Sequence, residues 1–303
     1  MPPANAPARQ LAFDAWGCRG SRNFAPALSR IANRTSCYSL VLGEDILVFD
    51  AGRGLGALGH ALRHEAGLQG VRRVHVLVTH AHMDHWEGLK DVEWFWRPGN
   101  GLEVVLYATA EAQGAMRRGF EPPAYVPLEL LAQGTVASFR RETLEAGSRL
   151  RLCGGELTTY SLNHYSGSAA THREIDTLGY RFALPGGPVV AYVSDHEPTA
   201  ATWDTERALV GDAHLAVYDA HFPDVKSHMH GHGSQEHAAA VARHFPGTLV
   251  LAGHHGPLFE DRELQASFEH FGAGLDNFSL AVEGARYVWS GGRFEPEPSA
   301  SPR

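Results

Sequence analysis

Short apolar runs separated by turn-forming residues extend along most of the chain, and they predict its β-strands. Several runs contain few polar residues and end in a single polar side chain, which is typical of strands buried on both faces. The runs are CYSLVL, DILVFDAG, VHVLVTH, LEVVLYAT, ELTTYSL, LGYRFAL, PVVAYVSD, LAVYDA, TLVLAGHH and RYVWSGG.

Helical periodicity appears between the strands at residues 54–65, 127–134 and 234–245. Ser234 is a suitable N-cap for the last of these helices. Strands first cluster, then alternate with helices, then cluster again, and we find no internal repeat of solenoid length. The pattern predicts an α/β fold, or more closely a layered α+β fold, in which helices flank two β-sheets around one core.

The length of 303 residues exceeds a typical domain, although layered α/β domains also reach about 250 residues. Hydrophobic residues (44%) and charged residues (20%) are spread along the chain, which predicts one large core and confines disorder to the ends. We therefore expect a disordered N-terminal tail at 1–10, a single domain at 11–294 and a disordered C-terminal tail at 295–303.

No stretch approaches the length of a membrane span, and the start MPPANAPARQ lacks the apolar centre of a signal peptide. These features predict a cytoplasmic protein with no membrane contact. Cys18, Cys37 and Cys153 are widely spaced and include no CxxC pair. Their spacing argues against a disulfide framework and against a thiolate zinc site.

The formal net charge of −8 disfavours a broad basic surface that binds a long nucleic acid. The region 1–43 is locally basic, however, because it contains several arginines and only one acidic residue, Asp14. Arg19 and Arg22, in the segment GCRGSR, are candidate phosphate contacts. A role of these arginines in surface solubility is the alternative.

Histidines and aspartates gather at the ends of four separate predicted strands. The segment THAHMDH (79–85) follows one strand directly, and three later strands each lead into a further metal-binding side chain. Strand ends are rigid and the loops beyond them are open to a substrate, so an active site is well placed there. The candidate ligands are His80, His82, Asp84, His85, His164, Asp195 and His254.

The spacing within THAHMDH favours two metal ions over one. His80 and His82 can face one ion from an extended turn, whereas Asp84 and His85 lie where a helix should begin and point elsewhere. Imidazole and carboxylate ligands without thiolate suit Zn²⁺, with Mn²⁺ or Fe as alternatives. Two divalent metal ions are therefore the expected cofactors, and they would ionise a shared water to hydroxide near neutral pH.

The segment THAHMDH resembles the HxHxDH signature of the metallo-β-lactamase superfamily, and the later ligand candidates fall in that family's order. The resemblance implies an αββα sandwich of two mixed β-sheets with a dinuclear site at one edge. The ligands implied for the first metal are His80, His82 and His164. Those implied for the second metal are Asp84, His85 and His254, with Asp195 as the bridging carboxylate. The segments WGCRGS, TSC, DAGRG and HGHGS resemble the branch of ribonuclease Z and cyclic-nucleotide phosphodiesterases.

Two further aspartates end predicted strands. By the resemblance, Asp50 would orient a metal-binding histidine. It could also cap the Gly-rich turn that follows, and both roles can hold together. Asp219 either supports His232 or a ligand, or serves as a buried structural carboxylate.

A histidine-rich stretch, 221–237, leads into the last predicted helix. By resemblance to the ribonuclease Z motif, His232 would protonate the leaving oxygen, a role that suits an imidazole with an ordinary pKa of about 6.5. His196 and His255 directly follow ligand candidates and are predicted not to bind metal. The predicted catalytic residues are His232, Asp195 and Asp84. The roles of His221, His228 and His230 stay open, including a third metal at the last two.

The leading hypothesis is a dinuclear metal-dependent phosphodiesterase that acts on a cyclic nucleotide or a short RNA end. The acidic charge balance favours a small phosphodiester over an extended nucleic acid. One alternative is a metallohydrolase of a lactone, thioester or β-lactam. Another is a non-catalytic member that binds a nucleotide or a protein. A homodimer is compatible with the sequence.

Overall fold

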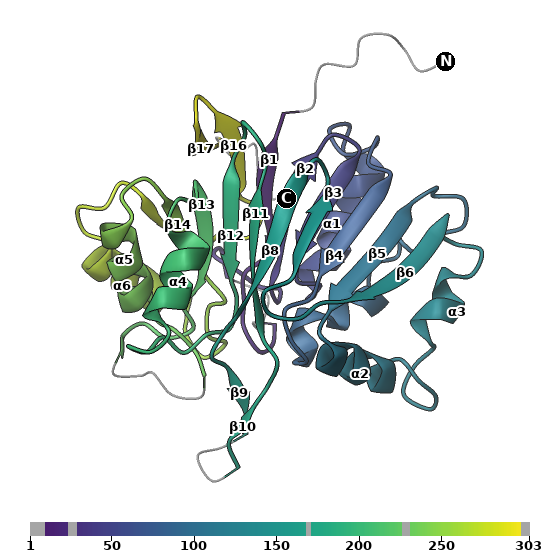
Figure 1. The fold of residues 1–303 in the computed structure, drawn as a ribbon, viewed down its shortest axis with the longest axis horizontal. Coiled ribbons are helices and arrows are strands. Elements are labelled where there is room, and N and C mark those ends of the chain that lie inside the picture. The colour runs from purple at the N-terminus through teal and green to yellow at the C-terminus, as the bar shows by residue number, and fades with distance from the viewer. Residues whose placement is uncertain (1–9, 24–28, 168–170, 226–230, 298–303) are drawn as a thin grey trace.

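Two β-sheets lie face to face at the centre of the computed structural model, which describes residues 10–23, 29–167, 171–225 and 231–297 (Figure 1). The first sheet has the order β17 (Arg293–Pro296), β16 (Arg286–Ser290), β1 (Ala12–Gly17), β2 (Cys37–Leu42), β3 (Asp45–Phe49), β4 (Arg73–Leu77), β5 (Glu103–Ala108), β6 (Ser138–Thr143). The second has the order β15 (Phe278–Leu280), β14 (Leu249–Gly253), β13 (Leu215–Asp219), β12 (Val189–Val193), β11 (Leu178–Ala183), β8 (Gly155–Ser161), β7 (Arg149–Leu152). A short ribbon of β9 (Tyr165–Ser166) and β10 (Arg173–Glu174) projects below both sheets in Figure 1.

Helices cover the outer sides of both sheets (Figure 1). Those beside the first sheet are α1 (Gly54–His64), α2 (Ala110–Gly119) and α3 (Leu128–Ala132). Those beside the second are α4 (Trp203–Val210), α5 (Gln235–His244) and α6 (Asp261–Phe271). Both sheets contain parallel and antiparallel pairs. The predicted αββα sandwich of two mixed sheets is therefore confirmed.

Strand β3 shows why the predicted runs are apolar throughout. Leu47 and Phe49 lie in the core between the sheets, where the Phe49 ring is 5.5 Å from the ring of Tyr192. Ile46 and Val48 lie in a second core that includes residues of α1. Because side chains alternate between the two faces of a strand, burial on both faces requires an apolar residue at nearly every position.

All ten predicted runs form strands, and the three predicted helices are present as α1, α3 and α5. Ser234 caps α5, since its hydroxyl accepts the backbone N–H of His237 at 3.1 Å. The elements that were not predicted are strands β1, β6, β7, β9, β10, β15 and β17 and helices α2, α4 and α6. Strand β17 ends at Pro296, so it extends into the predicted C-terminal tail.

The helix expected to begin within THAHMDH is replaced by two 3₁₀ turns, η1 (Met83–His85) and η2 (Glu87–Lys90). Backbone groups of this segment form hydrogen bonds with the loop after β3 instead of the regular i→i−4 bonds of an α-helix. The backbone N–H of Ala51 donates to the carbonyl of His85 at 2.7 Å, and that of Gly88 donates to the carbonyl of Ala51 at 2.9 Å. These bonds hold the segment against the loop that follows β3.

Candidate metal centre

The ends of strands from both sheets meet at one edge, the lower one in Figure 1, and bring the seven predicted ligands together. One group, with candidate ligand atoms within 4.8 Å of one another, consists of His80, His82, His164 and Asp195. A second group within the same limit consists of Asp84, His85 and His254. Ligands that are far apart in the sequence thus form two adjacent clusters.

Asp195 lies between the two groups. Its Oδ2 is 3.6 Å from Nε2 of His80 and 3.6 Å from Nε2 of His164. Its Oδ1 is 3.3 Å from Nε2 of His85 and 3.1 Å from Nδ1 of His254. Each carboxylate oxygen therefore faces a different group, which is the arrangement that a bridging carboxylate requires.

Three of these rings carry a buried nitrogen that forms no hydrogen bond with any described residue: Nε2 of His80, His85 and His254. A buried polar atom without a partner costs about 1–3 kcal/mol, so such atoms in a cluster need another explanation. Divalent cations would accept these lone pairs, and a donor set of imidazole and carboxylate suits zinc. The residues present therefore fit two such ions.

Burial and neighbouring charges set the protonation of the ligands. Burial lowers the pKa of His80 well below its ordinary value, that of His164 to about 4 and that of His254 to about 3. These rings are therefore neutral, which is the form that binds a metal. Burial acts to raise the pKa of Asp195, but His254 and His85 outweigh this effect and hold the pKa well below its usual range.

Asp50 forms a hydrogen bond with the ring of one candidate ligand, His85, on the side away from the cluster. Its Oδ2 accepts Nδ1–H of His85 at 2.7 Å and the hydroxyl of Tyr192 at 2.8 Å. Its Oδ1 accepts the backbone N–H of Thr79 at 2.8 Å. These bonds leave Nε2 of His85 to face the cluster. Among the described residues, none in the Gly-rich turn 51–56 bonds this carboxylate, so the contacts match the orienting role and not the capping role.

His232 lies beside the second group and pairs with Asp219. Its Nδ1 is 3.0 Å from Oδ2 of Asp219, and its ring stacks on those of His254 and His221 with centroids 5.1 Å and 4.2 Å away. Burial acts to lower the pKa of His232, but the carboxylates of Asp219 and Asp195 outweigh it and raise the pKa to about 9. The structure thus brings the predicted proton donor and its predicted support together.

The remaining candidate histidines differ in whether the structure describes them and in their hydrogen bonds. His228 and His230 lie outside the described residues. His221 is buried, and its Nδ1 has no hydrogen-bond partner among the residues that the structure describes. His196 and His255 direct Nε2 at a glutamate carboxylate and at a backbone carbonyl, respectively, and neither belongs to a candidate metal group.

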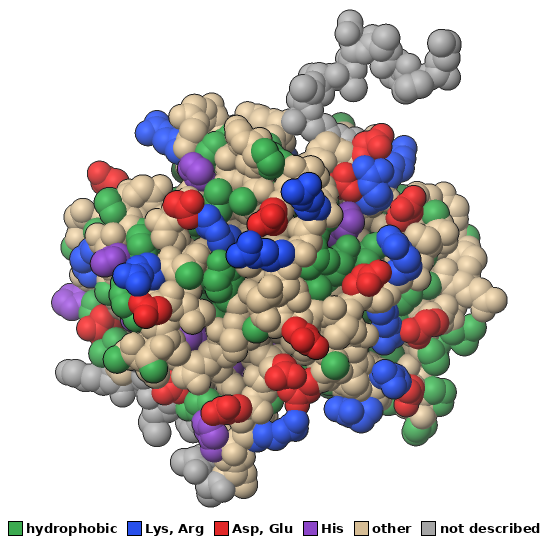
Figure 2. All heavy atoms as spheres, in the orientation of Figure 1, with side chains coloured by type: hydrophobic (Ala, Val, Ile, Leu, Met, Phe, Trp, Pro, Cys, Tyr) green, Lys and Arg blue, Asp and Glu red, His purple; other side chains and the backbone are tan. Residues whose placement is uncertain are grey.

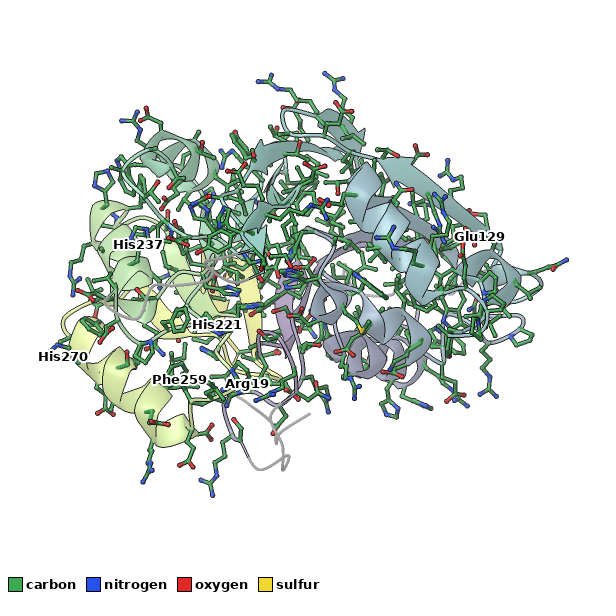
Figure 3. All side chains as sticks on the ribbon, turned by 90° about the horizontal axis from the view of Figure 1, so that it is seen from below. Arg19, Glu129, His221, His237, Phe259 and His270 are labelled. Atoms are coloured by element: carbon green, nitrogen blue, oxygen red, sulfur yellow. The ribbon has the colours of Figure 1, made fainter. Side chains whose placement is uncertain are left out.

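The structure corrects the predicted phosphate contact at Arg19. This side chain is fully buried; its Nε donates to the carbonyl of Ala32 at 2.8 Å, and Nη1 donates to those of Gly256 and Phe259 at 3.0 Å each. Figure 3 shows Arg19 beside Phe259. A guanidinium bound to backbone carbonyls anchors its own loop and cannot reach a substrate. Arg22 is exposed and lines a pocket beside the ligands, so it remains a candidate.

A buried carboxylate behind the centre was missed by sequence reasoning. Glu206, in α4, accepts Nε2–H of His196 at 3.2 Å and Nε2–H of His237 at 2.8 Å. It also accepts the hydroxyl of Tyr218. With the hydroxyl of Thr202, which donates to Oε1 at 2.8 Å, four donors therefore share one carboxylate, and three of them come from other segments.

This network reaches two of the candidate metal ligands through the backbone. Nδ1 of His196 accepts the backbone N–H of Asn163 at 3.0 Å. His196 directly follows Asp195, and Asn163 directly precedes His164. Glu206 therefore fixes the tautomer of a ring that connects the two loops carrying the candidate ligands Asp195 and His164.

Glu206→Gln is expected to weaken zinc binding by about tenfold and to destabilise the metal-free protein by about 1–3 kcal/mol, because the new amide donates where a donor needs an acceptor. Titration with a competing chromophoric chelator measures the first effect, and urea denaturation measures the second. Glu156→Gln, at an exposed position of β8, is the control. Lost stability with unchanged zinc affinity would show that the network supports the fold alone.

Comparison with known proteins agrees with this geometry. A family model described as the beta-lactamase superfamily domain matches residues 46–255. The chain is 26% identical to ribonuclease Z of Salinibacter ruber, over 84% of this chain and 88% of that protein. This similarity confirms the predicted resemblance to the ribonuclease Z branch.

Solved structures show the same fold. The metallo-β-lactamase fold protein YhfI of Bacillus subtilis has a TM-score of 0.64 at 15% identity, covering 92% of this chain and 99% of that one. Zn²⁺-bound PqqB of Methylobacterium extorquens has a TM-score of 0.63 at 18% identity, covering 91% and 99%. Within the described residues, no helix has the length and apolar character needed to cross a membrane. The assembled ligands and the match over most of the chain support a metal-dependent hydrolase, and the chain belongs to the beta-lactamase superfamily.

Proposed function

We propose that this chain is a dinuclear metal-dependent phosphodiesterase that cleaves a small phosphodiester, such as a cyclic nucleotide or a short RNA end. The observation that carries the proposal is the pairing of His232 with Asp219 beside two ligand groups that share Asp195. Two bound divalent ions would supply an ionised water and neutralise the charge on phosphate oxygens. We propose zinc, which the ligand types favour and which PqqB binds.

The other roles in the proposed reaction belong to separate residues of the chain. His80, His82 and His164 would hold one ion, Asp84, His85 and His254 would hold the other, and Asp195 would contact both. His232 would donate a proton to the leaving oxygen from Nε2, because Asp219 occupies Nδ1. Asp219 would keep that ring in one orientation and one tautomer.

The substrate proposed is small, although the relative in Salinibacter ruber is named as a ribonuclease. The net charge of −8 opposes the approach of a long polyanion. On the face drawn in Figure 2, blue cationic and red anionic side chains of the described residues are interspersed. A short RNA end needs only local contacts near the ligands and therefore stays within the proposal.

The test is a substrate panel on protein of measured zinc content. It contains bis-p-nitrophenyl phosphate, 2′,3′-cyclic and 3′,5′-cyclic nucleotides, a short RNA, a lactone, a thioester and a β-lactam. We expect turnover of phosphodiesters and none of the carbonyl compounds. Turnover of only the carbonyl compounds would replace the proposal by the second hydrolase class. No turnover by fully loaded protein would indicate a binding protein.

His232→Ala is expected to lower kcat for a phosphodiester with an alkoxide leaving group by about 10²–10⁴-fold, the range for lost general acid catalysis. The loss for a p-nitrophenyl ester is expected to be below about tenfold, because p-nitrophenolate leaves without a proton. Steady-state kinetics on the two substrates measure the contrast. His244→Ala, at the C-terminal end of α5, is the control. Equal losses on both substrates would exclude the proton-donor role.

A further inference from the structure

A pocket of about 260 Å³ opens beside the metal centre and shares one residue with it, Asp84. Its lining also includes two arginines, Arg22 and Arg53, and a second carboxylate, Glu87. Arg22 precedes β2 in the chain, whereas Arg53 immediately precedes α1. Two separate segments therefore bring cationic side chains to one cavity next to the ligands.

Two arginines and two carboxylates line this pocket, but only one of the carboxylates is paired with an arginine. Nε of Arg53 is 3.2 Å from Oε2 of Glu87, so these two side chains neutralise each other. Oδ2 of Asp84 accepts the backbone N–H of Ser21 at 2.7 Å and lies 3.3 Å from Nε2 of His85, which commits this carboxylate to the metal centre. Arg22 has no ion pair with any described residue. The pocket therefore keeps one uncompensated guanidinium.

Hydrogen bonds fix the backbone on the N-terminal side of Arg22. The backbone N–H of Arg22 donates to the carbonyl of Gly20 at 2.6 Å, and Ser21 between them has φ of 60°. A non-glycine residue in this region is strained, and such strain persists where the surroundings impose it, often at functional sites. Here the buried guanidinium of Arg19 and the bond from Gly20 N–H to the carbonyl of His255 impose it.

The second arginine keeps part of its surface free. The side chain of Arg53 is 44% exposed although it pairs with Glu87, whose side chain is 13% exposed. The backbone N–H of Arg53 donates to Oγ1 of Thr35 at 2.8 Å, which fixes the base of the side chain. Guanidinium groups present a planar fork of donors that matches phosphate oxygens.

We infer that this pocket is a subsite for a second phosphate group of the substrate, bound by Arg22 and Arg53 while the ligand clusters hold the scissile phosphodiester. This inference rests on the proposed function, because the ligand clusters must act on the same molecule. It narrows the substrate class to phosphodiesters that carry an additional terminal phosphate, such as a nucleotide phosphorylated at a second position.

The test uses two esters that differ only in the second phosphate: thymidine 5′-(p-nitrophenyl phosphate) and its 3′-phosphorylated form. We expect the zinc-loaded protein to cleave the 3′-phosphorylated ester with a kcat/KM at least about tenfold higher. Arg22→Ala and Arg53→Ala are each expected to reduce this ratio by about tenfold. Arg293→Ala, on the exposed edge strand β17, is the matched control and keeps the ratio of the native protein.

Two further measurements separate the explanations. Arg53→Ala leaves Glu87 unpaired, so the double variant Arg53→Ala/Glu87→Gln distinguishes a lost cation from a newly free carboxylate. Only a lost cation leaves the ratio low in the double variant. Inhibition by inorganic pyrophosphate should weaken by about tenfold in both single variants.

Each outcome bears on one proposal. If both esters are cleaved with equal kcat/KM, or if the arginine variants keep the native ratio, the subsite is wrong and the phosphodiesterase proposal stands. If neither ester nor any phosphodiester of the substrate panel is cleaved, the proposed function is wrong. The subsite is then judged on the pyrophosphate affinity measured by calorimetry, and an affinity unchanged in Arg22→Ala and Arg53→Ala overturns it.

Discussion

His82→Ala is expected to lower kcat/KM for bis-p-nitrophenyl phosphate by more than about 100-fold and to remove about one equivalent of bound zinc. Loss of residues that merely orient ligands costs about 10–100-fold in affinity or activity, so loss of a ligand should cost more. His82 is half-buried at the rim of the cluster, and its Nδ1 is 3.1 Å from Nε2 of His164. Its removal therefore affects the metal site more than the fold.

The measurement pairs steady-state kinetics with elemental analysis of the same samples. His60→Ala is the matched control, because His60 is an exposed histidine on α1. It should keep native zinc content and native activity. If His82→Ala retained both zinc equivalents and full turnover, the first ligand group would have no part in the reaction.

Asp50→Ala is expected to lower the free energy of unfolding by about 3–5 kcal/mol, the cost of breaking a buried charged pair by removing one partner. The substitution leaves the buried donors of Thr79, His85 and Tyr192 without their acceptor. It also frees the ring of His85 to rotate, and zinc affinity should fall by about 10–100-fold. Urea denaturation of metal-free protein and a zinc titration measure the two effects.

Tyr192→Phe separates these two effects. It removes one hydrogen bond to Asp50 and leaves the contact with His85 in place. The expected loss of stability is about 1 kcal/mol, with zinc affinity near the native value. A zinc affinity that fell equally in Asp50→Ala and Tyr192→Phe would contradict the orienting role of Asp50.

The convergence of the candidate ligands could be predicted because their positions follow from strand ends. A strand that is buried on both faces appears in the sequence as an apolar run, and the polar residue after it must lie at the edge of the sheet. His164, Asp195 and His254 follow β8, β12 and β14 of the second sheet. Their approach to the segment after β4 also requires that the two sheets face each other with these strand ends at the same edge. The strand-end position of Asp219, which ends β13, left its role open between support of His232 or a ligand and a structural one, and the role of His232 itself followed only from the resemblance to the ribonuclease Z motif.

The role of Arg19 could not be predicted in this way. Its neighbours Gly20, Ser21 and Arg22 resemble a polar surface loop, and arginine is rarely buried. Burial here depends on carbonyls of Gly256 and Phe259, which lie more than half the chain away and turn inward only in the folded protein. No local pattern in the sequence contains this information.

The burial of Glu206 could have been predicted from the sequence. It forms the buried side of α4 with Leu209 and Val210, at the spacing i, i+3, i+4. A charged residue on the apolar side of a helix requires polar partners in the core. Those partners, His196, His237 and Tyr218, could not be named from the sequence because they come from three other segments.

The most direct test of the dinuclear site is anomalous diffraction at the zinc edge from crystals of zinc-loaded protein. We predict two peaks about 3.5–4 Å apart, the usual separation in two-metal sites, with Asp195 between them. The ligands of one peak should be His80, His82 and His164, and those of the other should be Asp84, His85 and His254. A single peak, or peaks away from these residues, would contradict the account.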